Sequence, residues 1–395
     1  MEQKIAMSFP DHFFNPLLVF YRRLTRKIFG IISLRSRSKS SRGTVLLSFV
    51  THPFCISKKE FLKTPHTTPF ECMEIASLLL DRGYAVDVID WNNFSFTPKT
   101  KYVMIIDTHQ NLERLSAILP DCVKIHYITG AHWKYQNIAE TFRLGEFRKR
   151  RGATLQPRRQ MLPSSNIEYA DYATSLGSRF AKGTYDYAGK NIEMIPLLST
   201  ASFPSPEDKN FAEVRKNFVW IGGGGAIHKG LDLVLEVFSN LSDFRLTVCG
   251  PVEAEKDFFN FYKKELCHTP NIRFVGRINV RSEQFKNIVD NAVGLIYPSC
   301  SEGQSGSVVT ALHAGLIPII THQSGVDVSP FGLYLKDFSV QEITDSVIRV
   351  SKLPIDELRS RSTAAWKYAR ENHTMEIFKE RYAAFIDGVI KKENL

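Results

Sequence analysis

Short apolar runs alternate with segments of helical periodicity through most of the chain, in two blocks. In the first block, the runs 45–50, 85–89, 102–106 and 123–128 predict strands, and the apolar spacing of 70–82 and 112–119 predicts helices. The stretches 166–174 and 192–195 are expected to complete this block. Such alternation is typical of a parallel sheet covered by helices on both faces.

The second block is more regular. Strands are expected at 217–221, 244–249, 272–275, 293–297 and 316–321, with helices at 231–240, 254–266, 282–290 and 307–314. Further helical pattern covers 340–350, 354–371 and 375–390. The segment 199–208, with Pro204 and Pro206, is typical of an interdomain linker. We therefore expect an N-terminal extension over 1–42, Rossmann-like domains over 43–200 and 201–372, and a C-terminal helix, 373–395, that crosses back to the first domain.

Composition places the chain among soluble globular proteins. Its 395 residues are 43% hydrophobic and 23% charged, which suits two sizeable cores. No apolar run reaches the roughly 18–20 residues of a transmembrane helix. The six cysteines lack CxxC spacing, and Cys122, Cys249 and Cys300 adjoin predicted strands. This favours buried, reduced thiols in a reducing compartment over a zinc ribbon or a redox pair.

The net charge of +10 implies an anionic partner, and it is unevenly distributed. Residues 1–42 hold nine Lys and Arg against Glu2 and Asp11, interleaved with bulky apolar residues. That mixture is typical of a helix lying on an anionic membrane surface, while a disordered or core-docked extension is the alternative. Nucleic-acid binding would rest on charge alone, because no recognised binding motif is present.

A second basic block, 143–159, holds seven Lys and Arg against Glu146. Pro157 and Pro163 predict an irregular loop here, and loops often carry function. We expect this loop to recognise an anionic or lipid-phosphate acceptor through Arg148, Arg150 and Arg151, although charge runs are more often solvated faces.

Two glycine-rich loops carry the candidate chemistry. Gly222 to Gly225 follow a predicted strand and precede a helix, so that bare backbone, helix N–H groups and Lys229 could bind a diphosphate. The spacing matches neither GxGxxG nor GxxxxGK[ST]. The second loop, 297–320, reads YPSCSEGQSGSVVTALHAGLIPII and joins a buried strand to a helix. Its Glu302 is suited to accept hydrogen bonds from vicinal sugar hydroxyls.

Together these stretches resemble the donor site of family-4-type glycosyltransferases of the GT-B fold. The resemblance covers about 217–330 well, and extends more loosely to His66–Glu71 and Thr129–His132. It implies two Rossmann-like domains facing each other across a cleft. It also implies that a nucleotide sugar is held by the two loops, with contacts from Gly223, Gly224, Lys229, Gly303, Gln304, Ser305, Gly306 and Ser307.

Two positions depart from the family pattern. The family carries a second glutamate eight positions after the first, where it usually holds the donor ribose; here that position is Thr310, whose hydroxyl brings no charge. The family also places an arginine in the phosphate loop at the position of Gly224. One of two expected phosphate cations is therefore missing, and the basic block 143–159 is a candidate to compensate.

Two histidines of the first domain follow or precede predicted elements at the expected cleft. His132 comes after the strand 123–128, and the resemblance implies a role at the transferred sugar alongside Glu302; the alternative is a packed histidine beside Trp133. His66 precedes the helix 70–82 and is a weaker, acceptor-side candidate. His313 lies within the helix after the donor loop and is expected to pack.

The expected activity is transfer of a sugar from a nucleotide sugar to a saccharide or lipid-linked acceptor, in the synthesis of a polysaccharide or glycolipid. The resemblance implies retention of anomeric configuration. With no Asp-x-Asp triplet, a reaction without metal or other cofactor is favoured, because helix N-termini and cations can stabilise the leaving diphosphate. The expected location is the cytoplasm, or the inner face of a membrane. The alternatives are a non-catalytic nucleotide- or sugar-binding protein, a sugar-nucleotide epimerase, or a phosphorylase.

Overall fold

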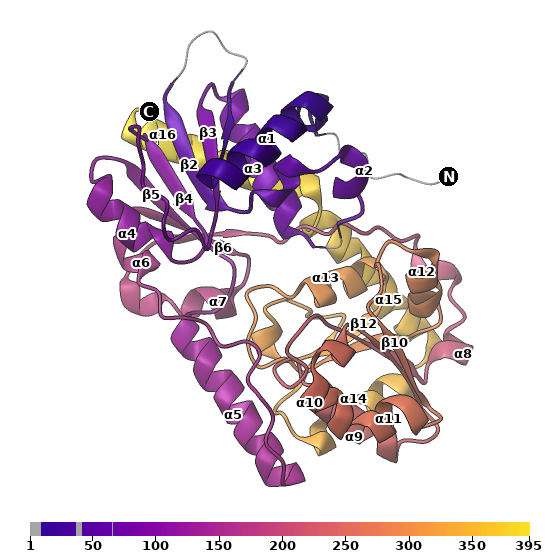
Figure 1. Cartoon of the computed structure of the whole chain (residues 1–395). Helices are drawn as coiled ribbons and strands as arrows, with labels where there is room; N and C mark the ends of the chain where they lie inside the picture. The colour runs from indigo at the N-terminus through magenta and orange to yellow at the C-terminus, as the bar shows by residue number, and fades with distance from the viewer. Residues whose placement is uncertain (1–8, 37–41, 65) are drawn as a thin grey trace.

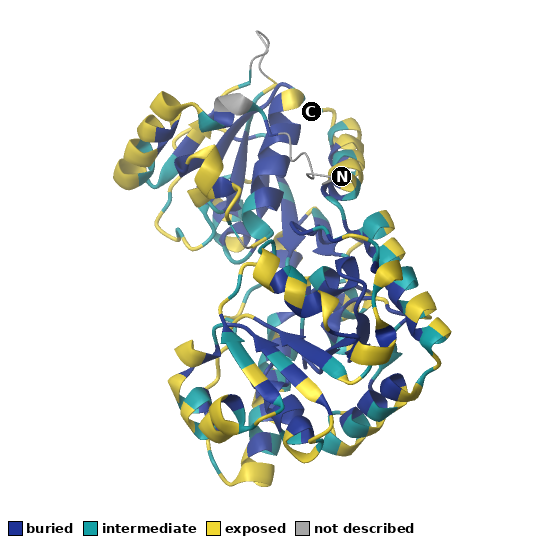
Figure 2. Ribbon diagram, turned by 90° about the vertical axis from the view of Figure 1, so that its right-hand side faces the viewer, coloured by how far each residue is buried: buried dark blue, intermediate teal, exposed yellow. Residues whose placement is uncertain are grey.

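The computed structural model describes residues 9–36, 42–64 and 66–395, and the chain folds as two α/β domains, each built around its own sheet (Figure 1). Both sheets are buried between layers of helices, and the exposed residues lie on the outer faces of those helices (Figure 2). The expected arrangement of two Rossmann-like domains is confirmed. Among the described residues no helix is long and apolar enough to cross a membrane.

The first sheet has the strand order β1-β3-β2-β4-β5-β6-β7. All neighbouring pairs are parallel except β1 with β3, where Ile31 lies opposite Ile89. Its strands are β1 (Ile31–Leu34), β2 (Thr44–Phe49), β3 (Ala85–Asp90), β4 (Met104–Asp107), β5 (Val123–Ile128), β6 (Tyr172–Leu176) and β7 (Ile192–Ile195). Its helices are α1 (Pro16–Phe29), α2 (Lys58–Phe61), α3 (Thr68–Asp81), α4 (Asn111–Ile118), α5 (Trp133–Arg151), α6 (Asn166–Tyr169) and α7 (Arg179–Gly183).

The second sheet has the order β10-β9-β8-β11-β12-β13 and is parallel throughout. Its strands are β8 (Asn217–Ile221), β9 (Arg245–Cys249), β10 (Ile272–Gly276), β11 (Gly294–Tyr297), β12 (Ile317–Ile320) and β13 (Leu333–Tyr334). The accompanying helices are α8 (Phe211–Val214), α9 (Leu231–Asn240), α10 (Lys256–Phe261), α11 (Lys263–His268), α12 (Glu283–Asp290), α13 (Gly306–His313), α14 (Val340–Lys352) and α15 (Ile355–Asn372). The strand order reverses between β8 and β11, the position at which open α/β sheets bind ligands.

The expectation of a loop over 143–159 is wrong for its first half, because residues 133–151 form the long helix α5. Four basic residues in its last turn complement the negative C-terminal end of the helix dipole, and Gly152 ends it in the left-handed conformation at φ 69°. The chain then returns along α5, where the Asn137 side chain bonds to the backbone of Met161. In Figure 1 α5 extends away from the first sheet and runs beside the second domain.

The described part of the N-terminal extension belongs to the first domain. Phe9 and Phe13 pack in its core against Phe61 and Phe54, and β1 adds an antiparallel edge strand to its sheet. The core-docked alternative therefore holds for these residues. The outer face of α1 nevertheless remains apolar and exposed, with Leu17 80% and Phe20 68% accessible. Residues 1–8 and 37–41 of the extension lie outside the described residues.

The last helix, α16 (Met375–Glu393), lies against the first domain. Asp387 pairs with Arg82 of that domain at 2.5 Å, and Lys379 pairs with Glu74 at 3.1 Å. The buried Tyr382 ring lies 5.9 Å from the Tyr127 ring. A chain that leaves the second domain thus ends in the core of the first, which ties the two domains together.

Candidate functional site

The candidate site lies at the carboxyl ends of β8 and β11. The glycine loop 222–225 follows β8, and a turn leads from it through Lys229 to the start of α9. The second loop follows β11 and carries Glu302. Apart from Asn217 at the start of β8, the residues of both strands are buried, and the first polar group of the site is the hydroxyl of Tyr297 at the end of β11.

Lys229 and Glu302 form an ion pair, with Nζ and Oε1 2.5 Å apart. The Tyr297 hydroxyl donates to the same Glu302 oxygen at 2.8 Å and accepts from Lys229 Nζ at 2.8 Å. The Ser299 hydroxyl also donates to this Glu302 oxygen, at 3.1 Å. Burial alone would raise the pKa of Glu302, but the charge of Lys229, with those of His228 and Arg159, outweighs it and holds the pKa at about 2. Glu302 is therefore a carboxylate, poised to accept hydrogen bonds.

The glycine loop already holds an anionic group of the chain itself. The Glu255 carboxylate accepts from the backbone N–H of Gly225 at 2.5 Å and of Ala226 at 3.1 Å. The N–H groups of Gly225 and Ala226 are thus already hydrogen-bonded. The space beside the first half of the loop is open, because a β-carbon at Gly223 would meet nothing within 4 Å and one at Gly224 would meet only Glu255, at 3.7 Å. The loop binds a carboxylate as such loops bind phosphates, and it leaves its first half for a ligand.

The second loop also forms the seam between the domains. The Gln304 side chain accepts from the Leu197 N–H at 2.7 Å and donates to the Gly177 carbonyl at 2.8 Å, both in the first domain. A β-carbon at Gly303 would lie 2.5 Å from the Thr129 carbonyl oxygen. Gln304 and Gly303, expected at the donor, therefore position the loop against the first domain.

The remaining donor-loop candidates lie on α13. Ser305 caps the helix by accepting from the Val308 N–H at 3.4 Å, and Gly306 and Ser307 form its first turn. Thr310 is half-buried on the same helix. His313 is buried, and its Nε2 bonds to the His373 carbonyl at 3.0 Å, so it packs as expected.

His132 caps the N-terminus of α5 and is held on every side. Its Nδ1 accepts from the Lys134 N–H at 3.4 Å, and its Nε2 lies 3.2 Å from the Tyr187 hydroxyl, which in turn donates to Glu168. Burial, partly offset by Glu168, lowers the pKa of His132. The ring is therefore neutral near pH 7. With Thr129 and Gly130 it lines a small cavity, next to the point where Gly303 meets the first domain.

His66 reaches the site from the first domain. Although its outer edge is exposed, desolvation of the ring, together with the charges of Arg159 and Lys229, lowers its pKa. Its ring therefore lies within electrostatic range of Arg159 and Lys229. Its role in acceptor binding stays a prediction.

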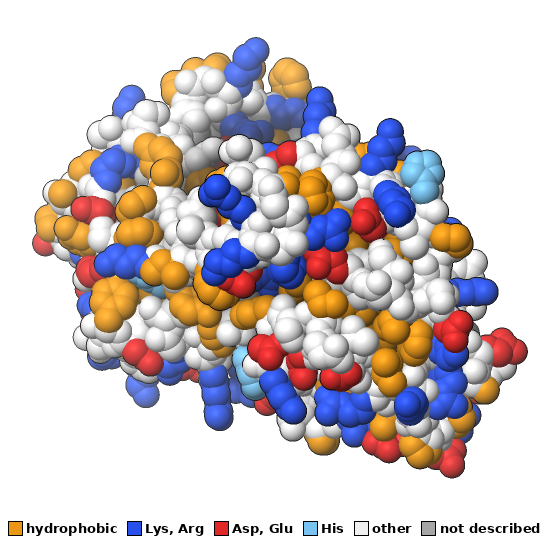
Figure 3. Space-filling model, turned by 90° about the horizontal axis from the view of Figure 1, so that it is seen from below, with side chains coloured by type: hydrophobic (Ala, Val, Ile, Leu, Met, Phe, Trp, Pro, Cys, Tyr) orange, Lys and Arg blue, Asp and Glu red, His pale blue; other side chains and the backbone are white. Residues whose placement is uncertain are grey.

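The arginines expected to bind an acceptor are largely engaged with the second domain. Arg150 pairs with Asp232 at 2.7 Å and with Glu236 at 3.1 Å, and Arg151 approaches Glu236 at 3.8 Å. Arg148 is exposed. Basic and acidic side chains are accordingly interspersed on the face of the molecule seen in Figure 3.

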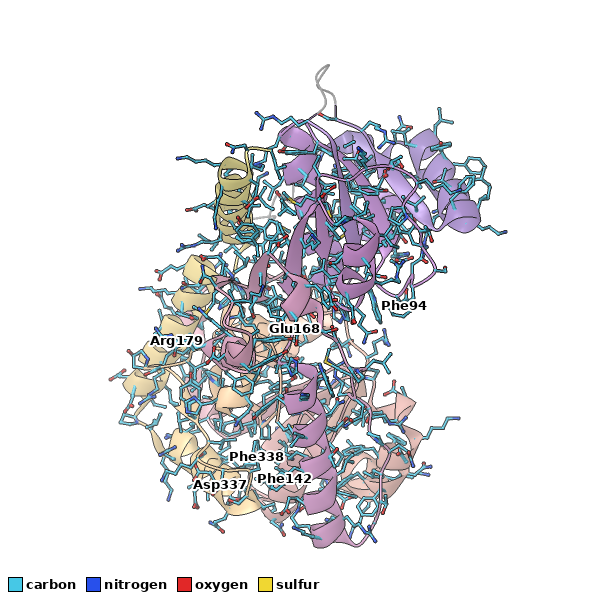
Figure 4. All side chains as sticks on the ribbon, turned by 90° about the vertical axis from the view of Figure 1, so that its left-hand side faces the viewer. Phe94, Phe142, Glu168, Arg179, Asp337 and Phe338 are labelled. Atoms are coloured by element: carbon cyan, nitrogen blue, oxygen red, sulfur yellow. The ribbon has the colours of Figure 1, made fainter. Side chains whose placement is uncertain are left out.

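Arg143, from the same block, is buried in the α5 interface. It pairs with Asp232 at 3.3 Å, donates to the Pro298 carbonyl at 3.1 Å and stacks over the Phe338 ring at 4.9 Å. Figure 4 places Phe338 beside the lower half of α5. The block thus fastens α5 to the second domain.

Sequence reasoning missed several groups that surround the pair, among them His228, Tyr297 and Arg159. His228 is buried and donates from Nε2 to the Ser301 carbonyl at 2.6 Å; burial lowers its pKa to about 4. His228 could have been recognised because it directly precedes Lys229. Tyr297 could have been recognised because it ends the strand that leads into the Glu302 loop. Arg159 belongs to the basic block 143–159 named as a candidate to replace the missing phosphate cation, but nothing in the sequence singles it out within that block. Among the described residues no cluster of His, Cys, Asp or Glu has the arrangement of a metal site.

Comparisons with known proteins agree with this geometry. Residues 215–352 match the family model Glycosyl transferases group 1. The whole chain is similar in fold to a sucrose-phosphate synthase from Thermosynechococcus elongatus, with a TM-score of 0.63, 12% identity, and coverage of 89% of this chain and 100% of that one. A glycosyltransferase from Rickettsia africae is similar with a TM-score of 0.60 and 12% identity, and the match covers 89% of this chain and 100% of that one.

HepE of Anabaena, solved with UDP and glucose, gives a TM-score of 0.56 at 11% identity, covering 87% of this chain and 99% of that one. These identities establish the fold alone, which is that of GT-B glycosyltransferases. No curated protein sequence matches the chain.

Proposed function

We propose that this chain, a GT-B glycosyltransferase whose second domain is of the glycosyl transferases group 1 type, transfers a sugar from a nucleoside-diphosphate sugar to a saccharide or lipid-linked acceptor. The observation that carries the proposal is the Lys229–Glu302 pair, buried at the carboxyl ends of two parallel strands and faced by the first domain. A cation and a carboxylate side by side match the two ends of a sugar diphosphate.

Donor binding exchanges the partners within this pair. The diphosphate takes the ammonium of Lys229, and Glu302 turns its freed lone pairs to hydroxyls of the donor sugar. Tyr297 keeps its proton, because burial raises its pKa to about 12. It remains a donor to Glu302 throughout. The charges of Lys229 and Glu302 therefore balance each other only before binding, because the diphosphate adds negative charge.

Transfer itself forms a bond between the acceptor oxygen and the anomeric carbon, and breaks the bond from that carbon to the diphosphate oxygen. The bonding electron pair leaves with the nucleoside diphosphate, whose charge Lys229 and the N-terminus of α9 stabilise. The acceptor proton passes to the departing phosphate oxygen on the same face of the sugar. In this proposed step the configuration is retained without a protein nucleophile, and the leaving group is stabilised without a metal ion.

A turnover assay tests this proposal. The native chain is incubated with UDP-, GDP- and ADP-sugars, with and without saccharide acceptors, and released nucleoside diphosphate is measured. Proton NMR of the product reports the anomeric configuration. We expect release that Glu302→Gln lowers at least about tenfold, since a charged hydrogen-bond acceptor is lost. Glu380→Gln, at an exposed position, is the control.

Retained configuration and activity in EDTA support the finer points. Donor binding without any transfer or hydrolysis would instead favour a non-catalytic nucleotide-sugar-binding protein. The Thr310 and Gly224 departures are the observations that favour this second candidate.

We also propose that α1 docks on an anionic membrane. Leu17, Tyr21, Leu24 and Ile28 repeat at helical spacing, and all four are exposed although their neighbours on the inner face are buried. Beside them, Arg23, Arg26, Lys27 and His52 line an open basic hollow. An apolar stripe bordered by basic side chains complements a lipid surface with anionic headgroups.

Co-sedimentation with vesicles tests this contact. Vesicles of phosphatidylglycerol and phosphatidylcholine should retain the native chain, and pure phosphatidylcholine should retain less. Replacing Leu17, Leu24 and Ile28 with serine should abolish retention without affecting folding, because these side chains are exposed. Equal retention of the variant would contradict the proposal. Concentration-dependent self-association through the stripe would show that a second copy covers it.

A further inference from the structure

The resemblance implies an arginine at the position of Gly224, and the glycine loop 222–225 of this chain carries no charged side chain. We infer that Arg159, which follows α5 in the chain, supplies a cation to the donor diphosphate from the opposite side of the site. This inference rests on the proposed function, and it assigns a binding residue that does not belong to the second domain's own loops.

The Arg159 side chain lies directly over the glycine loop. A β-carbon at Gly225 would be 2.6 Å from its Cγ and 3.0 Å from its Cδ, so Gly225, at φ 91°, leaves the room that this side chain occupies. A small cavity separates the loop from the returning segment, with Gly225 on one side and Arg158 on the other. The carboxylates of Glu140, Glu255 and Asp257 also line it, and each already accepts a hydrogen bond from a neighbouring backbone N–H. The stem of Arg159 thus reaches the loop that faces the diphosphate.

The Arg159 charge acts on the same groups as the proposed ligand. Burial is the largest cause of the pKa shifts of His66, His228, Lys229 and Glu302. The charge of Arg159 is a smaller cause at all four, after that of Lys229 at Glu302 and that of Glu302 at Lys229. The guanidinium therefore lies within electrostatic range of the Lys229–Glu302 pair. Lys229 and Arg159 are thus two cations near one loop, and an anionic ligand there would be attracted by both.

Among the arginines of the block 143–159, all of which the structure describes, only Arg159 and the exposed Arg148 have no carboxylate partner. Arg143, Arg150, Arg151 and Arg158 all pair with acidic residues of the second domain. Within the described ranges, no hydrogen bond or ion pair joins the Arg159 guanidinium to another protein group. Arginine is suited to bidentate contact with phosphate oxygens, and this one is free to make it.

The backbone at Arg159 is held firmly although the side chain is free. The buried Glu140 carboxylate accepts from the N–H groups of Arg158, at 2.9 Å, and Arg159, at 2.8 Å, and the Gln136 amide donates to the Arg159 carbonyl at 2.5 Å. Arg158 is anchored to Asp257 at 2.5 Å. Glu140 and Gln136 are thus positioning residues that hold the Arg159 backbone beside the loop. The ion pairs of Arg143 and Arg150 with Asp232 fix α5, and with it these two residues, relative to the second domain.

Calorimetry with UDP and UMP tests the assignment, with the GDP–GMP and ADP–AMP pairs run in parallel. We expect Arg159→Ala to weaken UDP binding about tenfold or more, as loss of one charge-assisted contact implies, and to weaken UMP binding less. Lys149→Ala, which removes an exposed charge of the same block, should leave both unchanged. Gly224→Arg in the Arg159→Ala background should restore UDP affinity, because Gly224 lacks positive φ and has space for a side chain.

The outcomes separate the inference from the proposed function. If the native chain binds none of the nucleoside diphosphates, the proposed function fails. If it binds UDP and Arg159→Ala binds UDP equally well, or loses UDP and UMP to the same extent, the assignment of Arg159 is overturned while the donor site stands.

Discussion

Replacing Asp232 with asparagine should destabilise the protein severely, because Asp232 holds two arginines of α5. It is fully buried, with Arg143 at 3.3 Å from one oxygen and Arg150 at 2.7 Å from the other, and Arg143 is itself only 1% exposed. Removing the carboxylate's charge leaves a buried guanidinium without its counter-ion. Breaking a buried pair in this way costs about 3 to 5 kcal/mol.

Thermal unfolding measures this cost. One kcal/mol lowers the midpoint of a domain of about 150–250 residues by about 2 to 4 °C, so Asp232→Asn should lower the midpoint by roughly 6 °C or more. Asp243→Asn is the matched control, since Asp243 is 81% exposed and lies 3.7 Å from Lys216. An exposed pair contributes only about 0 to 1 kcal/mol.

A double replacement isolates the interaction. Arg143→Met combined with Asp232→Leu removes both charges of this pair and fills similar volume, and such swaps are often neutral. We expect the double variant to be more stable than Asp232→Asn alone. A loss below about 1 kcal/mol for Asp232→Asn, or strictly additive effects, would refute the view that this pair clamps α5 to the second domain.

Two further predictions follow from the seam and from the buried histidines. Gly303→Ala should weaken donor binding and lower the unfolding midpoint, because its β-carbon would lie 2.5 Å from the Thr129 carbonyl oxygen. Gly388→Ala is the control and should lower neither, because a β-carbon there would meet nothing within 4 Å. Equal midpoints for the two variants would contradict the close approach of Gly303 to Thr129. Stability should also fall as pH drops below about 6.5. Burial lowers the pKa of His126 to about 3 and of His228, His313 and His373 to about 4. The unfolded state therefore binds protons between pH 6.5 and 4 that the folded state does not, and a midpoint constant over that range would contradict this.

The fold was largely predictable because apolar periodicity determines strands and helices locally. The expected strands 123–128, 192–195 and 217–221 coincide with β5, β7 and β8. The helix α5 was missed because its stabilising partners are distant in sequence: Asp232 and Glu236 lie more than 80 residues from the arginines they bind. A charge run alone does not reveal whether its charges are solvated or paired.

The central pair of the site, Lys229 and Glu302, could be predicted from the sequence, whereas the roles of Gln304 and Arg159 could not. Lys229 and Glu302 lie in the two loops that carry the resemblance to GT-B glycosyltransferases, and the structure brings them into contact. Gln304 instead bonds to the first domain, because a loop at a domain seam must satisfy neighbours on both sides. Arg159 reaches the glycine loop only through the return of the chain along α5, a tertiary arrangement that no local pattern encodes.

The most direct test of a donor site at the Lys229–Glu302 pair is calorimetric titration of the native chain, Lys229→Ala and Glu302→Ala with a panel of nucleotides and nucleotide sugars. The account predicts micromolar binding of one nucleotide sugar by the native chain. Lys229→Ala should weaken both the nucleotide sugar and its free nucleoside diphosphate, and Glu302→Ala should weaken mainly the sugar-bearing ligand. Absence of binding by the native chain, or binding that neither replacement alters, would contradict it.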